Sequence, residues 1–471
     1  MVICMLLEKI KQNINLEDII YRDIKMSNKT ITVIEIDTIT NSFDINNFIL
    51  KRLTILEKQS DLYNYLYNNI PCVNMKELTD YKEAIKLLLN AFTIMVIDDK
   101  AIAFETINFP IRGVSESTYE KAITGPKDSF IEHLNTNIGL IRKRIKSPNL
   151  KLENVNVGKY SNTQVSIMYI DGIAKTDLKD KILNKIKDIN IDGIIDSGYL
   201  KKYLTKSKSI FPTIKVTERP DLSSQALLEG KIVILVDNSP NALILPSFFI
   251  DYFHTSDDYY QKHVNITFIR IIRLLAFIIS IILPSFYIAI TTYNVDFIPI
   301  NLLVNFISQR TMVPFPAFIE ALIMIISFEI LRESDARIPS TWGSAISILG
   351  GLVLGEAAVS AGILSPIMII VVAISAISGL VFQSVEVVNA IRWWRFLLII
   401  LSSLLGLYGI FLGIILIITN LSDTKSFDSD YLYPFAPINF EEQKDGFIKT
   451  NEKIKKRNPI LSNNHIRGVI K

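Results

Sequence analysis

The feature that most constrains this chain is a change in composition at about residue 271. Lys, Arg, Asp and Glu are frequent up to Arg273, whereas Leu274 to Leu421 consists mostly of Ile, Leu, Val, Ala and Phe. Ile271 to Ile290 is long enough to cross a bilayer, which takes about 20 helical residues. The sequence therefore predicts an integral membrane protein, in which a large soluble α/β region precedes a group of membrane-spanning helices.

Further apolar stretches follow the first one. Pro284 is expected to kink the first helix rather than end it, because neighbouring helices can satisfy the freed carbonyl. Phe297–Ile307 is apolar but too short to span. The four other candidate spans are Phe315–Leu331, Trp342–Gly362, Ile363–Phe382 and Phe396–Thr419.

Basic residues suggest how these stretches are oriented. Arg270 and Arg273 precede the first span, which predicts a cytoplasmic N-terminal region by the positive-inside rule. The tail is placed on the same side by Lys449, Lys453, Lys455, Lys456 and Arg457. If both ends of the chain lie in the cytoplasm, the chain must cross the membrane an even number of times, yet five apolar stretches are long enough to be candidate spans. Either one stretch is re-entrant or Phe297–Ile307 extends into a sixth passage.

The soluble region contains an internal repeat. Ile31–Leu50 and Ser166–Leu183 each read as a strand that ends in Ile-Asp, a polar turn and a helix. Leu87–Asp99 and Ala226–Asn238 match in the same order, as a helix end followed by a buried strand. Two paired matches predict a duplicated α/β unit. Asp37 and Asp171 end equivalent strands. They either line a ligand crevice or form a strand-end turn, and the turn is the favoured interpretation.

The segment between the copies predicts an amphipathic connecting helix that ends at Ser147-Pro148. Its basic residues form either a docking surface for anionic lipid or a partner, or a solvated face. These residues are Arg142, Lys143, Arg144 and Lys146.

Together these patterns predict a multi-domain fold, an N-terminal α/β region with a duplicated unit followed by a polytopic helical membrane domain. The expected regions are a first cytosolic α/β subdomain (1–124), a connecting helix and linker (125–162), a second cytosolic α/β subdomain (163–269), a transmembrane helical domain (270–421) and a cytosolic tail (422–471).

Composition argues against several function classes. A net charge of +3 gives no sign of a nucleic-acid partner. Cys4 and Cys72 provide neither a disulfide framework nor a zinc site. The four histidines lack ligand spacing, and no P-loop, GxSxG or HExxH occurs, so no enzyme, catalytic residue, metal or cofactor is expected. They are His133, His254, His263 and His465.

Several motifs then resemble one family in order along most of the chain. The segments are Gly125–Leu150, Phe211–Asp221, Ala226–Pro240, Val313–Met324, Phe328–Pro339 and Tyr431–Ile438. They are similar to the A subunit of the GerA family of spore germinant receptors. Phe104–Pro110 and the Lys-rich tail after Phe440 depart from the family pattern.

The resemblance implies a multi-pass subunit in the spore inner membrane, with its N-terminal domain cytosolic. It also implies partnership with a permease-like B subunit, which binds the nutrient, and a lipoprotein C subunit. The A subunit is expected to form a homo-oligomeric, nutrient-gated cation channel that triggers germination. The alternative is a non-conducting scaffold that relays a signal for the permease-like subunit. Transport by this chain alone is a weaker third reading.

Carboxylates in the apolar stretches are the candidate ion-path residues. Glu320, Glu329 and Glu356 lie within or at the ends of apolar helices, where an ionised group costs several kcal/mol unless it is paired or hydrated. A ring of such acids favours cations. Glu329 can instead pair with Arg332 on its own helix, whereas Glu356 has no basic residue within helical reach and favours a water-lined path.

Two GxxxG motifs are candidate helix-packing sites. One contains Gly351 and Gly355, and the other contains Gly409 and Gly413. Small residues at this spacing let two helices approach closely. The contact is either between subunits or within one subunit.

Overall fold

The chain forms two compact units in a computed structural model. One comprises Met1–Lys206, Ile214–Pro246 and Lys453–Lys471, and the other comprises Ser207–Thr213 and Ser247–Glu452. The structure describes residues 5–14, 16–26, 29–51, 53, 62–70, 72, 74–97, 100–106, 120, 124–205, 209–337, 355–439, 443, 445–449, 458 and 460–462.

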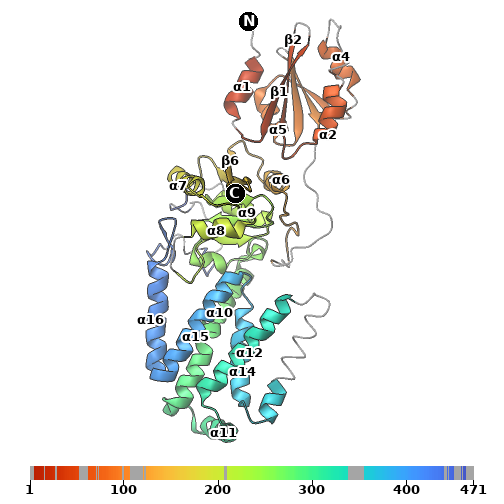
Figure 1. Ribbon diagram of the computed structural model, residues 1–471. Helices are drawn as coiled ribbons and strands as arrows, with labels where there is room; N and C mark the ends of the chain where they lie inside the picture. The colour runs from red at the N-terminus through yellow and green to blue at the C-terminus, as the bar shows by residue number, and fades with distance from the viewer. Residues whose placement is uncertain are drawn as a thin grey trace. The chain divides into compact units, whose positions relative to one another are not determined.

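The first unit contains two five-stranded sheets, seen with their helices in Figure 1. The first sheet has the strand order β1-β2-β4-β5-β3, and every neighbouring pair is antiparallel. Its elements are α1 (Met5–Asn13), β1 (Ile19–Met26), β2 (Lys29–Ile36), α2 (Ser42–Asp44), the π-helix η1 (Ile45–Leu50), α4 (Leu62–Asn69), β3 (Met75–Leu78), α5 (Tyr81–Leu88), β4 (Phe92–Ile97) and β5 (Lys100–Glu105).

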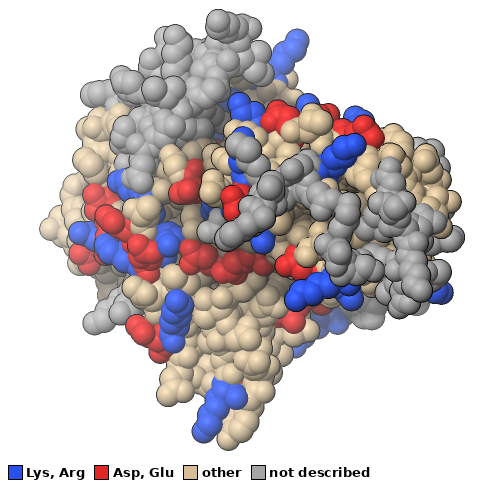
Figure 2. All heavy atoms as spheres, turned by 90° about the horizontal axis from the view of Figure 1, so that it is seen from above, with Lys and Arg blue, Asp and Glu red and all other residues tan. Residues whose placement is uncertain are grey.

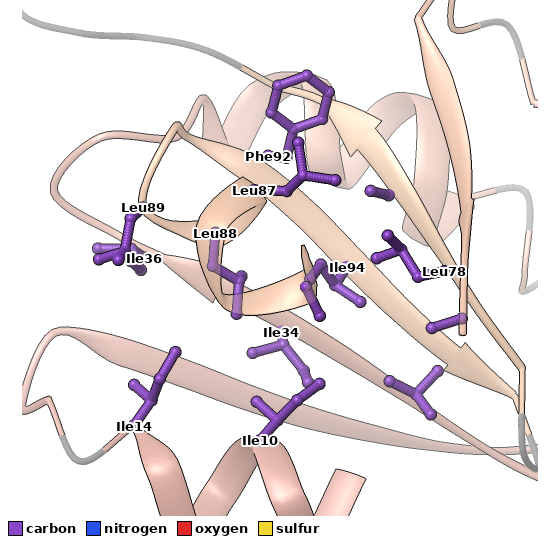
Figure 3. Close-up of a cluster of buried hydrophobic side chains, with 14 of the residues drawn as sticks. Ile10, Ile14, Ile34, Ile36, Leu78, Leu87, Leu88, Leu89, Phe92 and Ile94 are labelled. Carbon is purple, nitrogen blue, oxygen red and sulfur yellow. The ribbon is translucent and has the colours of Figure 1, made fainter. Parts of the chain in front are cut away.

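Helices cover both faces of this sheet because its central strands are apolar on both sides. All six residues of β4 are buried. Figure 3 shows Ile10 of α1, and Ile14 directly after this helix, meeting Ile34 of β2 and Leu88 of α5 on one face. On the other face, side chains of η1 and α4 pack against β2, β4 and β5. Burial of this apolar surface is the main stabilising contribution to such a fold.

The second sheet repeats the first. Its strand order is β6-β7-β9-β10-β8, again with antiparallel neighbours. Helices α6 and α9 share one core with it. The elements are α6 (Leu134–Arg144), β6 (Leu150–Val157), β7 (Thr163–Ile170), α7 (Thr176–Lys187), α8 (Ser197–Leu204), β8 (Lys215–Thr217), α9 (Pro220–Glu229), β9 (Ile232–Val236) and β10 (Ala242–Leu245).

The strands confirm the predicted repeat and extend it. Ile31–Ile36 and Val165–Ile170 both lie in strands that hold the second position of their sheets. Each sheet is also preceded by a helix, α1 or α6, and opens with a further strand, β1 or β6. The helix expected to connect the copies therefore packs as the opening helix of the second one, because seven of its eleven residues are buried.

The strand-end aspartates do not form a ligand crevice of the kind considered above. Such crevices lie at the carboxyl ends of parallel strands, and every strand pair described in these sheets is antiparallel. Asp37 and Asp171 are exposed, and Asp171 accepts a hydrogen bond from the amide of Gly172 in its turn. Both residues have the simpler role of ending a strand.

The second unit is mainly helical. Two of its described helices are long and apolar enough to cross a membrane, α10 (His263–Thr292) and α15 (Val385–Leu405). Its remaining elements are η2 (Phe249–Tyr252), η3 (Ser256–Tyr259), η4 (Val295–Phe297), α11 (Ile300–Arg310), α12 (Ala317–Arg337), α14 (Pro366–Gly379), α16 (Leu407–Asp423), β11 (Lys425–Ser426) and β12 (Ser429–Asp430).

Two helix boundaries differ from the prediction. Helix α10 begins at His263 and continues through Pro284. The predicted span Phe396–Thr419 was wrong as one helix, since Gly406 separates α15 from α16. Gly406 has φ +62°, a conformation that L side chains rarely adopt, and a Cβ there would lie 2.9 Å from Asn294 Oδ1. Most of the predicted span Trp342–Gly362 lies outside the described residues.

Charges of both signs are mixed on the face of the molecule drawn in Figure 2. Lys and Arg lie among Asp and Glu there. This distribution agrees with the small net charge of +3.

Candidate functional site

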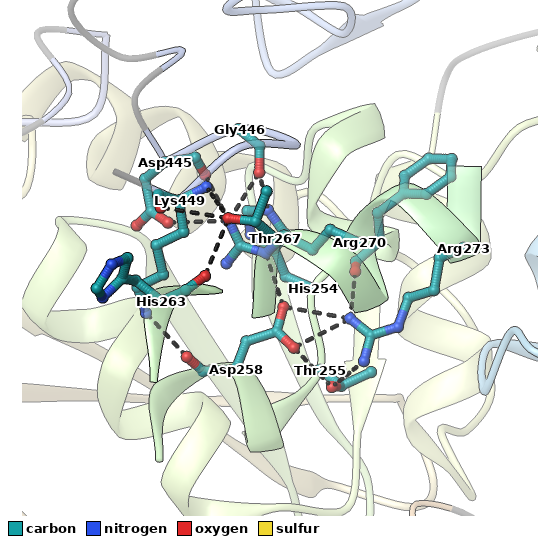
Figure 4. A network of polar contacts seen from close by, with 11 residues as sticks. His254, Thr255, Asp258, His263, Thr267, Arg270, Arg273, Asp445, Gly446 and Lys449 are labelled. Carbon is teal, nitrogen blue, oxygen red and sulfur yellow. Dashed lines mark hydrogen bonds and ion pairs between the residues drawn. The ribbon is translucent and has the colours of Figure 1, made fainter. Parts of the chain in front are cut away.

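A buried network of charged side chains links the first turns of α10 to the residues before this helix and to residues 445–449 (Figure 4). Asp258 lies between Arg270 and Arg273, with Oδ2 2.9 Å from Arg270 Nε and Oδ1 3.0 Å from Arg273 Nη1. Arg270 also donates to Asp445 Oδ1 at 2.9 Å and to the carbonyl of Gly446 at 2.7 Å. Arg270 and Asp258 are almost completely buried. The network therefore joins α10 to the segment that follows the last helices.

This network changes the interpretation of the two arginines. The positive-inside rule concerns basic residues that remain in the aqueous phase beside the membrane. Arg270 and Arg273 are instead buried and ion-paired. Lys449 donates to the carbonyl of Asp258, while Lys453 to Arg457 lie outside the described residues. These residues no longer support the predicted orientation by themselves.

Glu320 is held in a buried contact between two helices. Its Oε2 accepts hydrogen bonds from the amide of Ser365 at 2.9 Å and from the Ser365 hydroxyl at 2.7 Å. Ser365 is the N-cap residue of α14, so the carboxylate sits where the helix dipole is positive. Arg310 lies 3.6 Å away. With zero exposure, Glu320 occupies a position suited to fixing α12 against α14.

Glu329 is surrounded by guanidinium groups. The pair with Arg332 on the same helix is present at 2.6 Å. Two cross-helix partners on α15 were not foreseen, Arg392 at 2.9 Å and Arg395 at 3.0 Å. Their sequence signal is the motif Arg-Trp-Trp-Arg before the apolar run of α15. A carboxylate with three such neighbours is poorly placed to bind a cation.

A chain of polar groups continues from Glu329 across the helices. Arg395 Nη1 lies 3.5 Å from the hydroxyl of Ser375 on α14, which donates to the carbonyl of Ser280 on α10 at 2.9 Å. A cavity of about 210 Å³ opens beside this chain, and Glu329, Arg332, Asp335 and Arg395 supply its charged wall. Charged side chains and apolar side chains of α12, α14 and α15 thus line the same cavity.

Glu356 differs from the other two acids. It lies in the helical residues 355–360 and is exposed. No hydrogen bond or ion pair joins it to another residue that the structure describes. Its neighbours Gly355, Ala357 and Ala358 are small. An exposed carboxylate on an apolar helix requires water or a partner chain, because lipid would penalise its charge.

The second glycine motif packs within the chain. A Cβ on Gly409 would lie 2.1 Å from the carbonyl oxygen of Leu401, and one on Gly413 would lie 2.1 Å from Leu398 Cδ2. Both glycines therefore bring α16 against α15. Among the residues that the structure describes, Ile369 alone lies within 4.0 Å of such a Cβ on Gly355, and Gly351 lies outside these residues.

The basic residues of α6 do not form a common exposed face. Arg142 is 2% exposed and is paired with Asp18, which precedes β1. Arg144 pairs with Asp128 at 2.5 Å. Because Asp18 belongs to the first repeat and Arg142 to the second, their ion pair joins the two repeats. Arg142 is therefore not available to the docking surface for anionic lipid or a partner that the sequence suggested for this helix.

Comparison with known proteins identifies the family. Residues 5–461 match the family model described as "Bacillus/Clostridium GerA spore germination protein". Spore germination protein KA of Bacillus subtilis (strain 168) is 36% identical over 441 residues, which cover 92% of this chain and 81% of that protein. Spore germination protein GerQA of Bacillus cereus is 35% identical over 451 residues, 95% of this chain and 90% of that protein.

A solved structure also matches the N-terminal part. It is the N-terminal domain of the A subunit of the Bacillus megaterium spore germinant receptor GerK3, with 26% identity and a TM-score of 0.38. The match covers 52% of this chain and 94% of that chain. The match of the family model along nearly the whole chain establishes that this protein belongs to the GerA family of Bacillus/Clostridium spore germination proteins.

Proposed function

We propose that this chain is the A subunit of a nutrient germinant receptor in the spore inner membrane, where it oligomerises into a nutrient-gated cation channel. The expected partners are a permease-like B subunit and a lipoprotein C subunit. Family membership along residues 5–461 is the observation that carries the receptor role. The apolar helices α10 and α15 support a membrane position, and a multi-pass arrangement is part of the proposal.

Glu356 is the proposed cation-selective residue. Glu320 and Glu329 already have buried or basic partners, whereas Glu356 is exposed on a helix of small residues. In a homo-oligomer, copies of this residue would form a ring of carboxylates around a path, and such a ring attracts cations. The neighbouring small residues leave space for water and for close approach of a second copy.

The alternative is a non-conducting scaffold. The buried contacts of Glu320 and the three arginines around Glu329 favour it, because both acids then serve packing between helices. In this case the permease-like subunit moves the solute and this chain relays the signal. The two functions differ in their dependence on the charge of Glu356.

The test is the substitution Glu356→Gln in spores. Glutamine preserves the shape and removes the charge, so a conducting path loses its attraction for cations, and K⁺ release after nutrient addition is expected to slow about tenfold or more. Glu333→Gln is the matched control, because Glu333 is exposed and pairs only with Arg337 on its own helix among the described contacts. Normal release from Glu356→Gln spores that contain normal amounts of the protein contradicts the proposed role of Glu356 in conduction.

We also propose that the N-terminal region and the tail both lie on the cytoplasmic side, as the family resemblance implies for the N-terminal domain. Single cysteines at Lys202 and Lys455, in a chain whose Cys4 and Cys72 are replaced by serine, are then expected to react equally with a membrane-impermeant maleimide from the cytoplasmic side. Labelling is measured in sealed vesicles of known orientation, before and after they are opened with detergent. Opposite accessibility of the two positions excludes an even number of crossings.

A further inference from the structure

We propose that the cavity between α12, α14 and α15 binds the phosphate group of an anionic lipid. The proposal rests on the proposed membrane position of these helices. The cavity has a volume of about 210 Å³, and its wall includes Glu329, Arg332, Asp335 and Arg395. A phosphate group is small enough for this space. Arginine is the side chain best suited to bind it, since the planar guanidinium presents two parallel donors to two oxygens.

The charges in the cluster around the cavity are not balanced. The carboxylate of Glu329 has guanidinium nitrogens of Arg332, Arg392 and Arg395 at 2.6, 2.9 and 3.0 Å. Asp335 is the other acid in the cavity wall. The wall itself holds two arginines, Arg332 and Arg395, against these two carboxylates. Arg392 pairs with Glu329 without lining the cavity, and it gives the surrounding cluster one positive charge in excess. An excess cation beside an apolar region is costly unless an anion approaches it.

One donor at the cavity also lacks an acceptor. Nε of Arg395 is buried and has no hydrogen-bond partner among the described residues, although the side chain is only 7% exposed. A buried donor that is left unsatisfied costs free energy, most of all on a charged group. A phosphate oxygen in the cavity would supply the missing acceptor and the missing negative charge together.

The surroundings favour a lipid over a soluble phosphate. Ile377 and Leu380 in the wall are 63% and 66% exposed, which gives acyl chains an apolar surface beside the cavity. The cavity also lies near helix ends, because α12 ends at Arg337, α14 ends at Gly379 and α15 begins at Val385. Pockets with basic residues between membrane helices are typical sites for anionic head groups.

The test measures lipid binding by the purified full-length chain in detergent, independently of germination. Phosphatidylglycerol and phosphatidylcholine are titrated, and bound lipid is counted by native mass spectrometry. Arg332→Gln is the principal variant, because Arg332 lines the cavity and is partly exposed, so its loss is less damaging than loss of the buried Arg395. Arg337→Gln is the matched control, since Arg337 pairs with Glu333 on the exposed side of α12.

We expect phosphatidylglycerol to bind at least tenfold more tightly than phosphatidylcholine. Arg332→Gln is expected to weaken it about tenfold, and Arg337→Gln to leave it unchanged. Equal binding of the two lipids, or an equal loss in both variants, overturns the proposal. In a separate experiment, glycerol phosphate or inorganic phosphate is added to the same purified chain, and the increase in its melting temperature is measured. If either stabilises the chain as strongly as phosphatidylglycerol, the site is one for soluble phosphate and the lipid assignment is wrong.

Discussion

Replacing Asp258 by asparagine is expected to prevent the chain from accumulating in the membrane. The change removes the carboxylate that Arg270 and Arg273 share, and Arg270 is 1% exposed. Breaking a buried ion pair by removing one partner costs about 3–5 kcal/mol, because the remaining charge is left uncompensated. A loss of this size is a large part of the stability of a typical domain.

The measurement is the amount of full-length protein in the membrane fraction, with the aggregated fraction measured in parallel. Asp423→Asn provides the control, since Asp423 is exposed at the end of α16. It removes the same charge and is expected to leave the protein level unchanged. Wild-type levels and an unchanged melting profile for Asp258→Asn show that the network in Figure 4 is dispensable.

Loss of the Arg142 side-chain charge is expected to loosen the contact between the two repeats. Arg142→Met leaves Asp18 buried with only the hydroxyl of Thr38 as a side-chain partner, at 2.8 Å, among the described contacts. The cost is again about 3–5 kcal/mol. Amide hydrogen exchange in β1 and α6 of the full-length chain should therefore accelerate by about two to four orders of magnitude, if these segments open together.

Arg144→Met is the control on the same helix. Arg144 pairs with Asp128 in a partly exposed contact, which is worth about 1 kcal/mol or less. The double variant Arg142→Met with Asp18→Asn removes both charges and should recover part of the protection, so a double-mutant cycle isolates the pair. Equal exchange in the Arg142 and Arg144 variants means that the buried pair does not hold the repeats together.

The repeat was predictable from sequence because each copy keeps its own local pattern. Alternating apolar residues followed by Ile-Asp mark β2 and β7 without any knowledge of their partners. The opening helices were harder to assign. Helix α6 carries Arg142, Lys143 and Arg144 in its last turn, which is typical of a solvated face. Burial of Arg142 depends on Asp18, which lies 124 residues away.

The candidate site shows the same division between local and distant contacts. Pairing of Glu329 with Arg332 follows from a spacing of three residues on one helix. In the contacts with Arg392 and Arg395, the paired residues are more than 60 positions apart in sequence, so no periodicity reveals them. The break at Gly406 was also missed, because the apolar character of Phe396–Thr419 continues through it and only the positive φ requires glycine.

Ion flux through liposomes that contain the purified chain is the most direct test of the proposed channel. The chain is reconstituted with its partner subunits and, separately, alone, and the complete complex is exposed to the nutrient mixture that germinates the parent spores. We expect K⁺ flux through the complete complex, with a preference for K⁺ over Cl⁻ that Glu356→Gln abolishes and Glu333→Gln preserves. Flux no greater than that of empty liposomes, in a complex shown to be fully assembled, would contradict the channel and leave this chain as a scaffold.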